Sequence, residues 1–425
     1  MNRIHNAKYD ETYYEEILDN GLDVIVWHKP SYTTSSCIFA TPYGSLDLDQ
    51  IDEKGKIIHF PAGIAHFLEH KLFESDHGDV MSDFSSMGAN VNAFTSYAET
   101  VYYFTTASEM IEKPLNLLLD FVQDLSITDE SVEKEKGIID QELSMYLQMP
   151  DSRMLLETLK SMYLNHPLKN DIGGTAETVE QITKPLLEEC YRVNYHPANM
   201  MAVIVTPQDP EKIMDIVRRN QAAKKFVPAD KVKRHAEAEP ITVVRKHYEQ
   251  KMDVSESKAC IGIKLPVIQE SDEDRVTRDW ALHLTLDAYF SSVNPAYQTW
   301  LDQKKITPYF GYEEDMGRDY SMMMFYDETE NPEEFEAFIM SQIENCLHKK
   351  MREDDLLQLK NREIGSNLHM FNVPEQISIH FFRDRQNGVS LFRNFEILSK
   401  LDAETCWNLL KNLDYSNETM TVIHR

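Results

Sequence analysis

The order of predicted strands and helices occurs twice along the 425 residues, and this repetition limits the fold more than any other feature of the sequence. In each half, two strands precede two helices, a second strand pair follows, and further helices lead to a closing strand. The closing strands lie at about 200–205 and 418–424, and the predicted helices include 176–194 in the first half and 272–290 in the second. We therefore predict an α+β fold of two homologous domains, each a mostly antiparallel sheet flanked by helices. The predicted domains are 1–220 and 241–425, joined by a linker at 221–240 that is rich in Ala, Lys, Asp and Glu.

A helix predicted at about 61–75 carries the motif His66-x-x-Glu69-His70. At 100° per residue the two histidines and the glutamate share one face, and an apolar stripe on another face is formed by Ile64, Leu68 and Leu72. Two imidazoles one turn apart can both bind a single Zn²⁺, while the glutamate remains free to act as a base. The alternative is an amphipathic surface helix on which these residues coincide by chance. The second half has no such motif, and the single histidine of its matching helix, His283, is predicted to be structural.

A catalytic zinc ion needs a third protein ligand, and a second acidic helix predicted at about 129–148 offers candidates. Glu135 and Glu142 are seven residues apart and so lie on one face of that helix. Ile138 and Ile139 lie between them on the side that we expect to be buried, which favours carboxylates pointing inward. The alternative is an acidic helix face exposed to solvent.

The overall charge and the cysteines exclude several classes of protein. The net charge is −28 and no basic run is present, so nucleic acid or an anionic membrane surface is not an expected partner. The five cysteines are widely spaced without a Cys-x-x-Cys pair, which is typical of reduced thiols in the cytoplasm. We expect neither a secretion signal nor a membrane span, because no long apolar stretch occurs.

The histidine motif on the first helix and the glutamates on the second together resemble the pattern of the pitrilysin or insulinase family of zinc metallopeptidases, the inverzincins. His-x-x-Glu-His is followed some seventy residues later by a glutamate that is itself preceded by another glutamate at minus seven. Further shared segments are Asn20-Gly21-Leu22, Asn92-Ala93-Phe94-Thr95-Ser96, His166-Pro167, Gly173-Gly174-Thr175 and Tyr195-His196-Pro197-Ala198-Asn199-Met200. The resemblance spans nearly the whole chain and is strongest to the short two-domain bacterial and mitochondrial-processing-peptidase-like branch.

The resemblance assigns roles to five residues of the two helices. It implies that His66, His70 and Glu142 hold one Zn²⁺ per chain. It implies that Glu69 is the general base of peptide hydrolysis, and that Glu135 is an outer carboxylate that orients a metal ligand.

The resemblance also implies residues that contact the substrate. Asn92 and Ala93 match an edge strand to which an extended peptide adds by backbone hydrogen bonds. Tyr309 matches a tyrosine that polarises the scissile carbonyl, but Asp302 stands where the family has an arginine. A carboxylate cannot donate the paired hydrogen bonds of a guanidinium, so another chain is expected to supply that arginine.

On this resemblance we expect a cytoplasmic zinc-dependent endopeptidase that hydrolyses unfolded peptides inside a closed chamber. The chain corresponds to half of the family's clamshell, so a dimer is expected, with a homologous chain that lacks the zinc motif favoured over a second copy. The alternatives are a non-catalytic or regulatory subunit of a peptidase-like complex and a zinc-stabilised structural module. The last is disfavoured because a structural zinc site would close with a fourth Cys or His, and no Cys lies near the motif.

Overall fold

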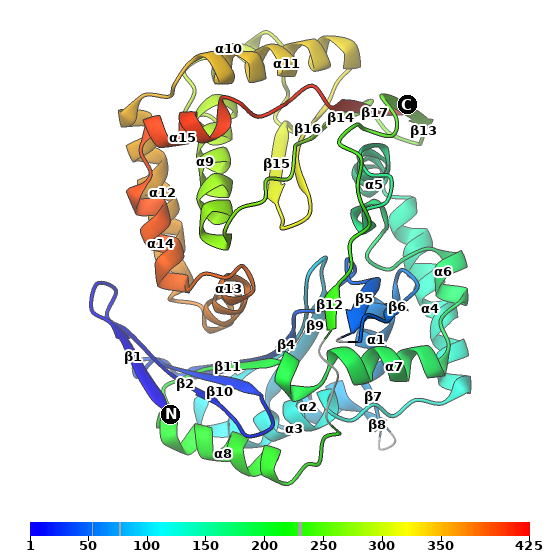
Figure 1. Cartoon of the computed structure of the whole chain (residues 1–425), viewed down its shortest axis with the longest axis vertical. Helices are drawn as coiled ribbons and strands as arrows, with labels where there is room; N and C mark the ends of the chain where they lie inside the picture. Colours follow the sequence, from blue (N-terminus) through cyan, green and yellow to red (C-terminus); the bar gives the residue numbers. More distant parts are fainter. Residues whose placement is uncertain (53, 76–77, 228–231) are drawn as a thin grey trace. The chain divides into compact units, whose positions relative to one another are not determined.

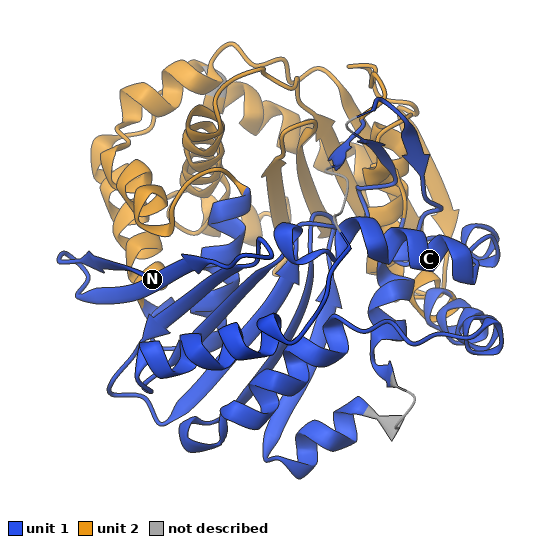
Figure 2. Ribbon diagram, turned by 60° about the horizontal axis from the view of Figure 1, so that its bottom comes forward, with its two compact units in different colours: residues 1–143, 171–235, 369–386 blue, residues 144–170, 236–368, 387–425 orange. Residues whose placement is uncertain are grey.

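The computed structural model describes residues 1–52, 54–75, 78–227 and 232–425, and the chain forms two compact units (Figure 2). Unit 1 comprises residues 1–143, 171–235 and 369–386, and unit 2 comprises residues 144–170, 236–368 and 387–425. Each unit is built on a mostly antiparallel sheet with helices packed against it, which confirms the predicted α+β class. Among the described residues, no helix has the length and apolar character needed to cross a membrane.

Unit 1 contains a seven-stranded sheet in the order β1-β2-β3-β11-β4-β10-β9 (Figure 1). Its strands are β1 (Asn2–Asn6), β2 (Glu11–Ile17), β3 (Asp23–His28), β4 (Thr34–Thr41), β9 (Ala89–Thr95), β10 (Thr100–Ala107) and β11 (Met201–Thr206). The described neighbours pair antiparallel except β3 and β11. Every residue of β11 is buried, so both faces of the sheet centre are covered. Strand β9 is last in this order and, among the described strands of the sheet, pairs with β10, so it is an edge strand.

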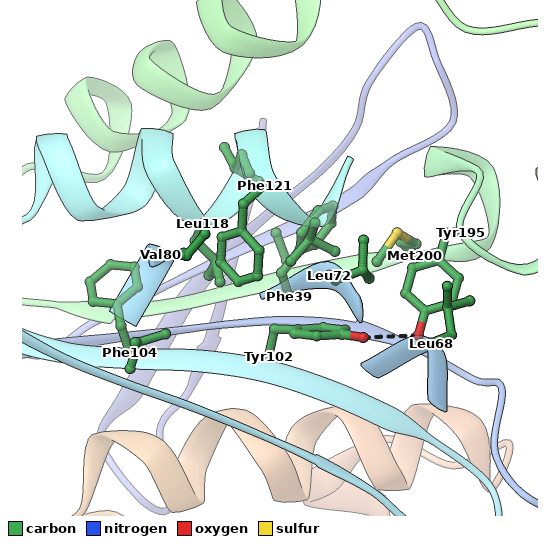
Figure 3. Close-up of a cluster of buried hydrophobic side chains, with 14 of the residues drawn as sticks. Phe39, Leu68, Leu72, Val80, Tyr102, Phe104, Leu118, Phe121, Tyr195 and Met200 are labelled. Carbon is green, nitrogen blue, oxygen red and sulfur yellow. Dashed lines mark hydrogen bonds between the residues drawn. The ribbon is translucent and has the colours of Figure 1, made fainter. Parts of the chain in front are cut away.

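Besides the helix of residues 374–386 described below, unit 1 contains α1 (Ile64–Leu72), α2 (Val80–Ser86), α3 (Glu112–Val122), α4 (Asp129–Leu147, ending in unit 2), α6 (Ala176–Glu180), α7 (Lys184–Asn194) and α8 (Pro210–Ala222). Of these, α1, α2, α3 and α8 pack directly against strands of the sheet. Figure 3 shows the resulting core, in which Phe39, Tyr102 and Phe104 of the sheet meet Leu68 and Leu72 of α1 and Leu118 and Phe121 of α3. Two short sheets complete the unit, one of β12 (Val232–Arg234), β5 (Asp49–Asp52) and β6 (Ile57–His59), the other of β7 (Glu74–Ser75) and β8 (Gly78–Asp79).

The single helix predicted at 176–194 is in fact two helices, α6 and α7. Thr175 caps α6 through a capping box with Thr178, and α7 restarts with Pro185 in its first turn. Proline fits the first turn of a helix, but inside a helix it lacks the N–H for the i−4 hydrogen bond and its ring clashes with that carbonyl group. One continuous helix therefore cannot run from 176 through Pro185, and the chain breaks between Glu180 and Lys184.

Unit 2 repeats this plan around a five-stranded sheet in the order β13-β17-β14-β16-β15. The strands are β13 (His247–Lys251), β14 (Lys258–Lys264), β15 (Gly311–Met316), β16 (Ser321–Glu328) and β17 (Glu418–His424), with β13 and β17 parallel. Its helices are α5 (Pro150–Met162), α9 (Asp272–Phe290), α10 (Tyr297–Asp302), α11 (Pro332–His348), α12 (Glu353–Met370, whose last residues belong to unit 1), α14 (Leu391–Lys400) and α15 (Ala403–Leu410). Strand by strand, β13, β14, β15, β16 and β17 take the places of β3, β4, β9, β10 and β11.

The two halves of the sequence exchange one helix each. Helix α5 packs on β14 and β17 of unit 2, and α13 (Pro374–Gln386) packs on the equivalent strands β4 and β11 of unit 1. Gly262 of β14 permits the first contact, because a Cβ there would lie 2.6 Å from Thr158 of α5. The predicted contiguous domains 1–220 and 241–425 therefore differ from the two units at 144–170 and 369–386. Part of the predicted 221–240 linker, residues 228–231, lies outside the described residues.

Candidate metal centre

The helix that carries the histidine motif begins at a close backbone contact. Gly63 has φ +93°, and a Cβ on it would lie 2.3 Å from the carbonyl oxygen of Gly173. A Cβ on Gly173 would in turn lie 3.5 Å from Nδ1 of His66 and 2.9 Å from Leu143. Gly63 therefore needs to be glycine so that the loop can lie against the start of α1, whereas a side chain at Gly173 would press on the end of the Leu143 side chain. The helix itself, Ile64–Leu72, is shorter than the predicted 61–75.

Helix α4 supplies the facing carboxylates. Its buried positions include Glu135, Ile139 and Leu143, which follow one another at intervals of four residues. The expectation that Ile138 is buried is wrong, because its side chain is 45% exposed. A rotation of 100° per residue turns Ile138 away from the face on which Ile139 is buried. Glu142 lies at the border of this face and is partly exposed.

The structure brings His66, His70 and Glu142 together. One ligand atom of each lies within 4.8 Å of the others. Oε2 of Glu142 is 3.9 Å from Nε2 of His66 and 3.8 Å from Nε2 of His70. Tetrahedral zinc bonds of 2.0–2.1 Å place ligand atoms roughly 3.4 Å apart, so a small inward adjustment of the side chains would fit the ion.

The two imidazoles differ in their protonation. Burial, followed by the nearby His70, lowers the pKa of His66 to about 4, so His66 is neutral at ordinary pH. Its Nδ1 is buried and has no hydrogen-bond partner among the described residues. His70 is held differently, because its Nδ1 lies 3.0 Å from Oε1 of Glu135. Burial lowers the pKa of His70, but the Glu135 hydrogen bond and the nearby carboxylates outweigh burial and raise it. Nδ1 is therefore the donor to Glu135, and a metal at Nε2, which faces Glu142, would take the place of a proton.

Glu69 lies beside this cluster without belonging to it. The Thr95 hydroxyl on β9 donates a 2.8 Å hydrogen bond to Oε2 of Glu69. Burial raises the pKa of Glu69, and the Thr95 hydrogen bond opposes that rise without cancelling it. A buried carboxylate with a raised pKa is suited to accept and return a proton near neutral pH.

Lys71 is a component of the site that the sequence analysis missed. Its side chain is fully buried, and its ammonium group forms an ion pair with Glu74, lies 3.7 Å from Oε2 of Glu135 and donates a 3.2 Å hydrogen bond to the carbonyl oxygen of Ser131. Burial raises the pKa of Glu135, but the hydrogen bond from His70 and the charge of Lys71 outweigh burial and lower it overall. Lys71 thus adds to the effect of His70 in keeping Glu135 ionised. A lysine on the core side of an amphipathic helix was the available signal.

The predicted substrate-contacting residues lie on different parts of the chain. Asn92 and Ala93 belong to β9, whose ladder pairing among the described strands is with β10. The Asn92 amide oxygen accepts a 2.9 Å hydrogen bond from the N–H of Ala93. Tyr309 and Asp302 belong to unit 2, where the Tyr309 ring is 67% exposed and has the Lys258 ammonium 5.7 Å from its centre.

Two repeated α+β units, with a His-x-x-Glu-His helix facing a glutamate-bearing helix, are the features of a zinc-protease-like chain. Family models agree, since residues 60–176 match insulinase (peptidase family M16) and residues 181–363 match the peptidase M16 inactive domain. The chain belongs to the M16, or insulinase, family, and the resemblance found in the sequence is confirmed.

Two similar proteins cover nearly the whole chain, and a third covers less than half of it. It is 36% identical over 409 residues to the "Uncharacterized zinc protease YmfH" of Bacillus subtilis, covering 96% of this chain and 95% of that protein. A crystal structure of an M16-like peptidase from Alicyclobacillus acidocaldarius matches with TM-score 0.91 at 30% identity, covering 97% of this chain and 98% of that one. The "Probable mitochondrial-processing peptidase subunit beta" of Schizosaccharomyces pombe is 29% identical over 188 residues, which are 43% of this chain and 39% of that protein.

Proposed function

We propose that this chain is a zinc-dependent endopeptidase that hydrolyses unfolded peptides. The observation that carries the proposal is the convergence of His66, His70 and Glu142 on one point, with Glu69 beside it and outside the ligand set. A bound Zn²⁺ would supply a Lewis acid that polarises the scissile carbonyl and acidifies water. Three protein ligands would leave one position open, as catalytic zinc sites require.

Residues of the chain itself carry out proton transfer and hold the catalytic groups in position. Glu69 accepts the proton of the attacking water and returns it to the leaving nitrogen, and its raised pKa suits both steps. Glu135 holds His70 in the tautomer that presents Nε2. Thr95 on β9 holds the Glu69 carboxylate in place, so the strand that positions the proposed base is also the strand to which the substrate is proposed to bind.

The open edge of β9 favours an extended peptide as the substrate. A peptide added to this edge would take the backbone hydrogen bonds that β9 leaves unpaired, and it could replace the Asn92 oxygen as the acceptor for the Ala93 N–H. A folded protein cannot present a free strand in this way. We therefore propose that flexible peptides of modest length are cleaved within an enclosed chamber and that stably folded proteins are not.

The chamber requires a second chain, and we propose a homologous subunit that lacks the zinc motif. Asp302 in place of an arginine supports this, as does the subunit named among the relatives. The cytoplasm is the proposed location, because Cys37, Cys190, Cys260 and Cys406 are buried free thiols that suit a reducing compartment.

The decisive experiment compares Glu69→Gln with the parent chain and with Glu130→Gln, an exposed glutamate of α4. A mixed peptide library is incubated with each, the products are read by mass spectrometry, and zinc content is measured in parallel. We expect Glu69→Gln to keep its zinc and to lose turnover by about 10²–10⁴-fold, with Glu130→Gln unchanged. Equal cleavage by Glu69→Gln would refute the assigned base. If the parent chain binds zinc but cleaves nothing, alone or with a homologous partner, the regulatory-subunit alternative is favoured.

A further inference from the structure

Unit 2 contains a second cluster with the composition of a metal site. His283 and Asp287 lie one turn apart on α9, and Glu363 lies on α12. One ligand atom of each lies within 4.8 Å of the others. Nε2 of His283 is 3.5 Å from Oδ2 of Asp287 and 3.9 Å from Oε2 of Glu363. These separations match those of the candidate zinc cluster in unit 1, which are 3.9 and 3.8 Å.

The position of the cluster in the repeat is an independent observation. Helix α9 follows β14 and precedes the β15–β16 pair, just as α1 follows β4 and precedes the β9–β10 pair. Helix α12 is the second long helix after its strand pair, and so is α4. The two clusters are therefore built from the same two helices of the repeated fold. In each, two ligands at i and i+4 on the first helix meet a glutamate from the second.

An outer carboxylate orients the histidine in both units. Nδ1 of His283 lies 2.6 Å from Oε1 of Glu314 on β15, as Nδ1 of His70 lies 3.0 Å from Glu135. This contact directs Nε2 of His283 toward Asp287 and Glu363. A carboxylate behind the histidine is the usual support of a metal-bound imidazole.

A positively charged side chain, Arg362, also contacts the cluster. The Arg362 guanidinium contacts Asp287 and lies 2.9 Å from Glu363, while the Tyr312 hydroxyl donates to the other oxygen of Asp287. Burial lowers the pKa of His283, but the hydrogen bonds and charges of Glu314 and Glu363 outweigh burial and raise it to about 9. With Glu314 counted, three carboxylates therefore face two cations, Arg362 and protonated His283, and negative charge is in excess by one. A divalent ion must displace the proton on His283 as well as the guanidinium. Arg362 is 47% exposed and can swing into solvent, which leaves the ligand atoms to a divalent ion.

We propose that His283, Asp287 and Glu363 form a second divalent-metal site, of the Zn²⁺ or Mn²⁺ class, which competes with the Arg362 guanidinium. One imidazole and two carboxylates suit these ions better than Ca²⁺ or Cu⁺. The site does not catalyse hydrolysis, because the residue three positions after His283 is the buried Leu286, where unit 1 has Glu69. Its role is to join α9 to α12.

The test uses full-length protein in which the unit 1 cluster is disabled by His66→Ala and His70→Ala. Chelator-treated protein is titrated with Zn²⁺ and, separately, with Mn²⁺, and bound metal is counted after equilibrium dialysis. We expect one equivalent to remain, and Glu363→Gln in this background to remove it. Arg362→Gln should tighten binding at least tenfold, because the competing cation is gone. Arg352→Gln, an exposed arginine paired with Asp355 just before α12, is the matched control and should change nothing.

Circular dichroism and thermal unfolding of each variant show whether it is folded. If the folded double variant binds neither ion, with or without Arg362→Gln, the cluster is only an ion-pair network and the proposal is overturned. Binding that is unaffected by Glu363→Gln overturns it as well, since the ion then lies elsewhere. This result is independent of peptidase activity.

Discussion

Replacing Glu135 by glutamine tests the reasoning about the metal centre most directly. Glutamine keeps the shape of the side chain but removes the negative charge that faces Nδ1 of His70 at 3.0 Å. The Glu135 side chain is 7% exposed, so solvent screens this contact little. A hydrogen bond involving a charged group contributes about 1.5–3 kcal/mol, which corresponds to roughly a 10- to 100-fold loss in zinc affinity. Glu142→Gln removes a ligand and should cost more.

The change also affects the metal-free protein, and the two effects can be separated. Lys71 loses its carboxylate partner at 3.7 Å but keeps Glu74 and the Ser131 carbonyl oxygen. We expect the free energy of unfolding of the metal-free chain to fall by about 1–3 kcal/mol. Urea unfolding of the chelator-treated variants measures this fall in the free energy of unfolding.

Zinc affinity itself is measured by competition with a fluorescent chelator at constant pH and ionic strength. Glu133→Gln is the matched control, because Glu133 lies on the same helix, is 64% exposed and pairs with Lys136 alone among the described residues. The expected order of dissociation constants is parent equal to Glu133→Gln, then Glu135→Gln, then Glu142→Gln. A Glu135→Gln constant within a factor of three of the parent would refute the orienting role. A larger effect at Glu135 than at Glu142 would exchange the two assignments.

Three further predictions follow from the structure. Because burial lowers the pKa of His66 from 6.5 to about 4, the unfolded chain binds more protons at this residue, and His66 should contribute a loss of about 2 kcal/mol to the unfolding free energy of the metal-free protein between pH 8 and pH 5. His70, whose pKa is raised because nearby carboxylates outweigh burial, contributes with the opposite sign. Urea titration should therefore find a loss about 2 kcal/mol larger in the parent than in His66→Gln, and equal losses in both would contradict the prediction. Phe381 of α13 packs 5.8 Å from Trp27, and Phe381→Ala should cost about 3–5 kcal/mol of unfolding free energy, whereas a change below 1 kcal/mol would mean that α13 does not close the core of unit 1. Asp302 stands where the family has an arginine, so a partner chain is expected to supply that arginine. A peptide-cleavage assay should then find that the chain alone is weakly active and that the partner strongly stimulates it. High activity of a pure homodimer, unchanged in Tyr309→Phe, would argue against a partner.

The elements that could be predicted from the sequence are those with local signals. Helix α9 at 272–290 and strand β17 at 418–424 have the predicted bounds, because Ser271 caps the helix and the strand is a compact β-branched run. Helix α13 was not predicted at all. Its apolar residues make contact with strands that lie more than 160 residues away in the sequence, so its stability comes from packing that no local pattern records.

The candidate site likewise combines features that are local in the sequence with features that depend on packing between distant segments. The spacing of His66, Glu69 and His70 is a property of one helix and could be read directly. The choice of Glu142 as the third ligand needed the family resemblance, because the acidic helix offers several carboxylates. Lys71 could not be placed from the sequence, since its burial depends on α4 covering it.

The contrast between the two clusters depends on where each unit places its own cation. In unit 1, Lys71 is buried behind Glu135, so it balances the outer carboxylate and leaves the ligand atoms open. In unit 2, Arg362 lies on Asp287 and Glu363 themselves, so a metal must first displace it. Displacing Arg362 costs free energy, and this cost weakens metal binding at the unit 2 cluster but not at the unit 1 cluster. A chain with both clusters intact should therefore fill in two steps, unit 1 first, and Arg362→Gln should bring the second step closer to the first.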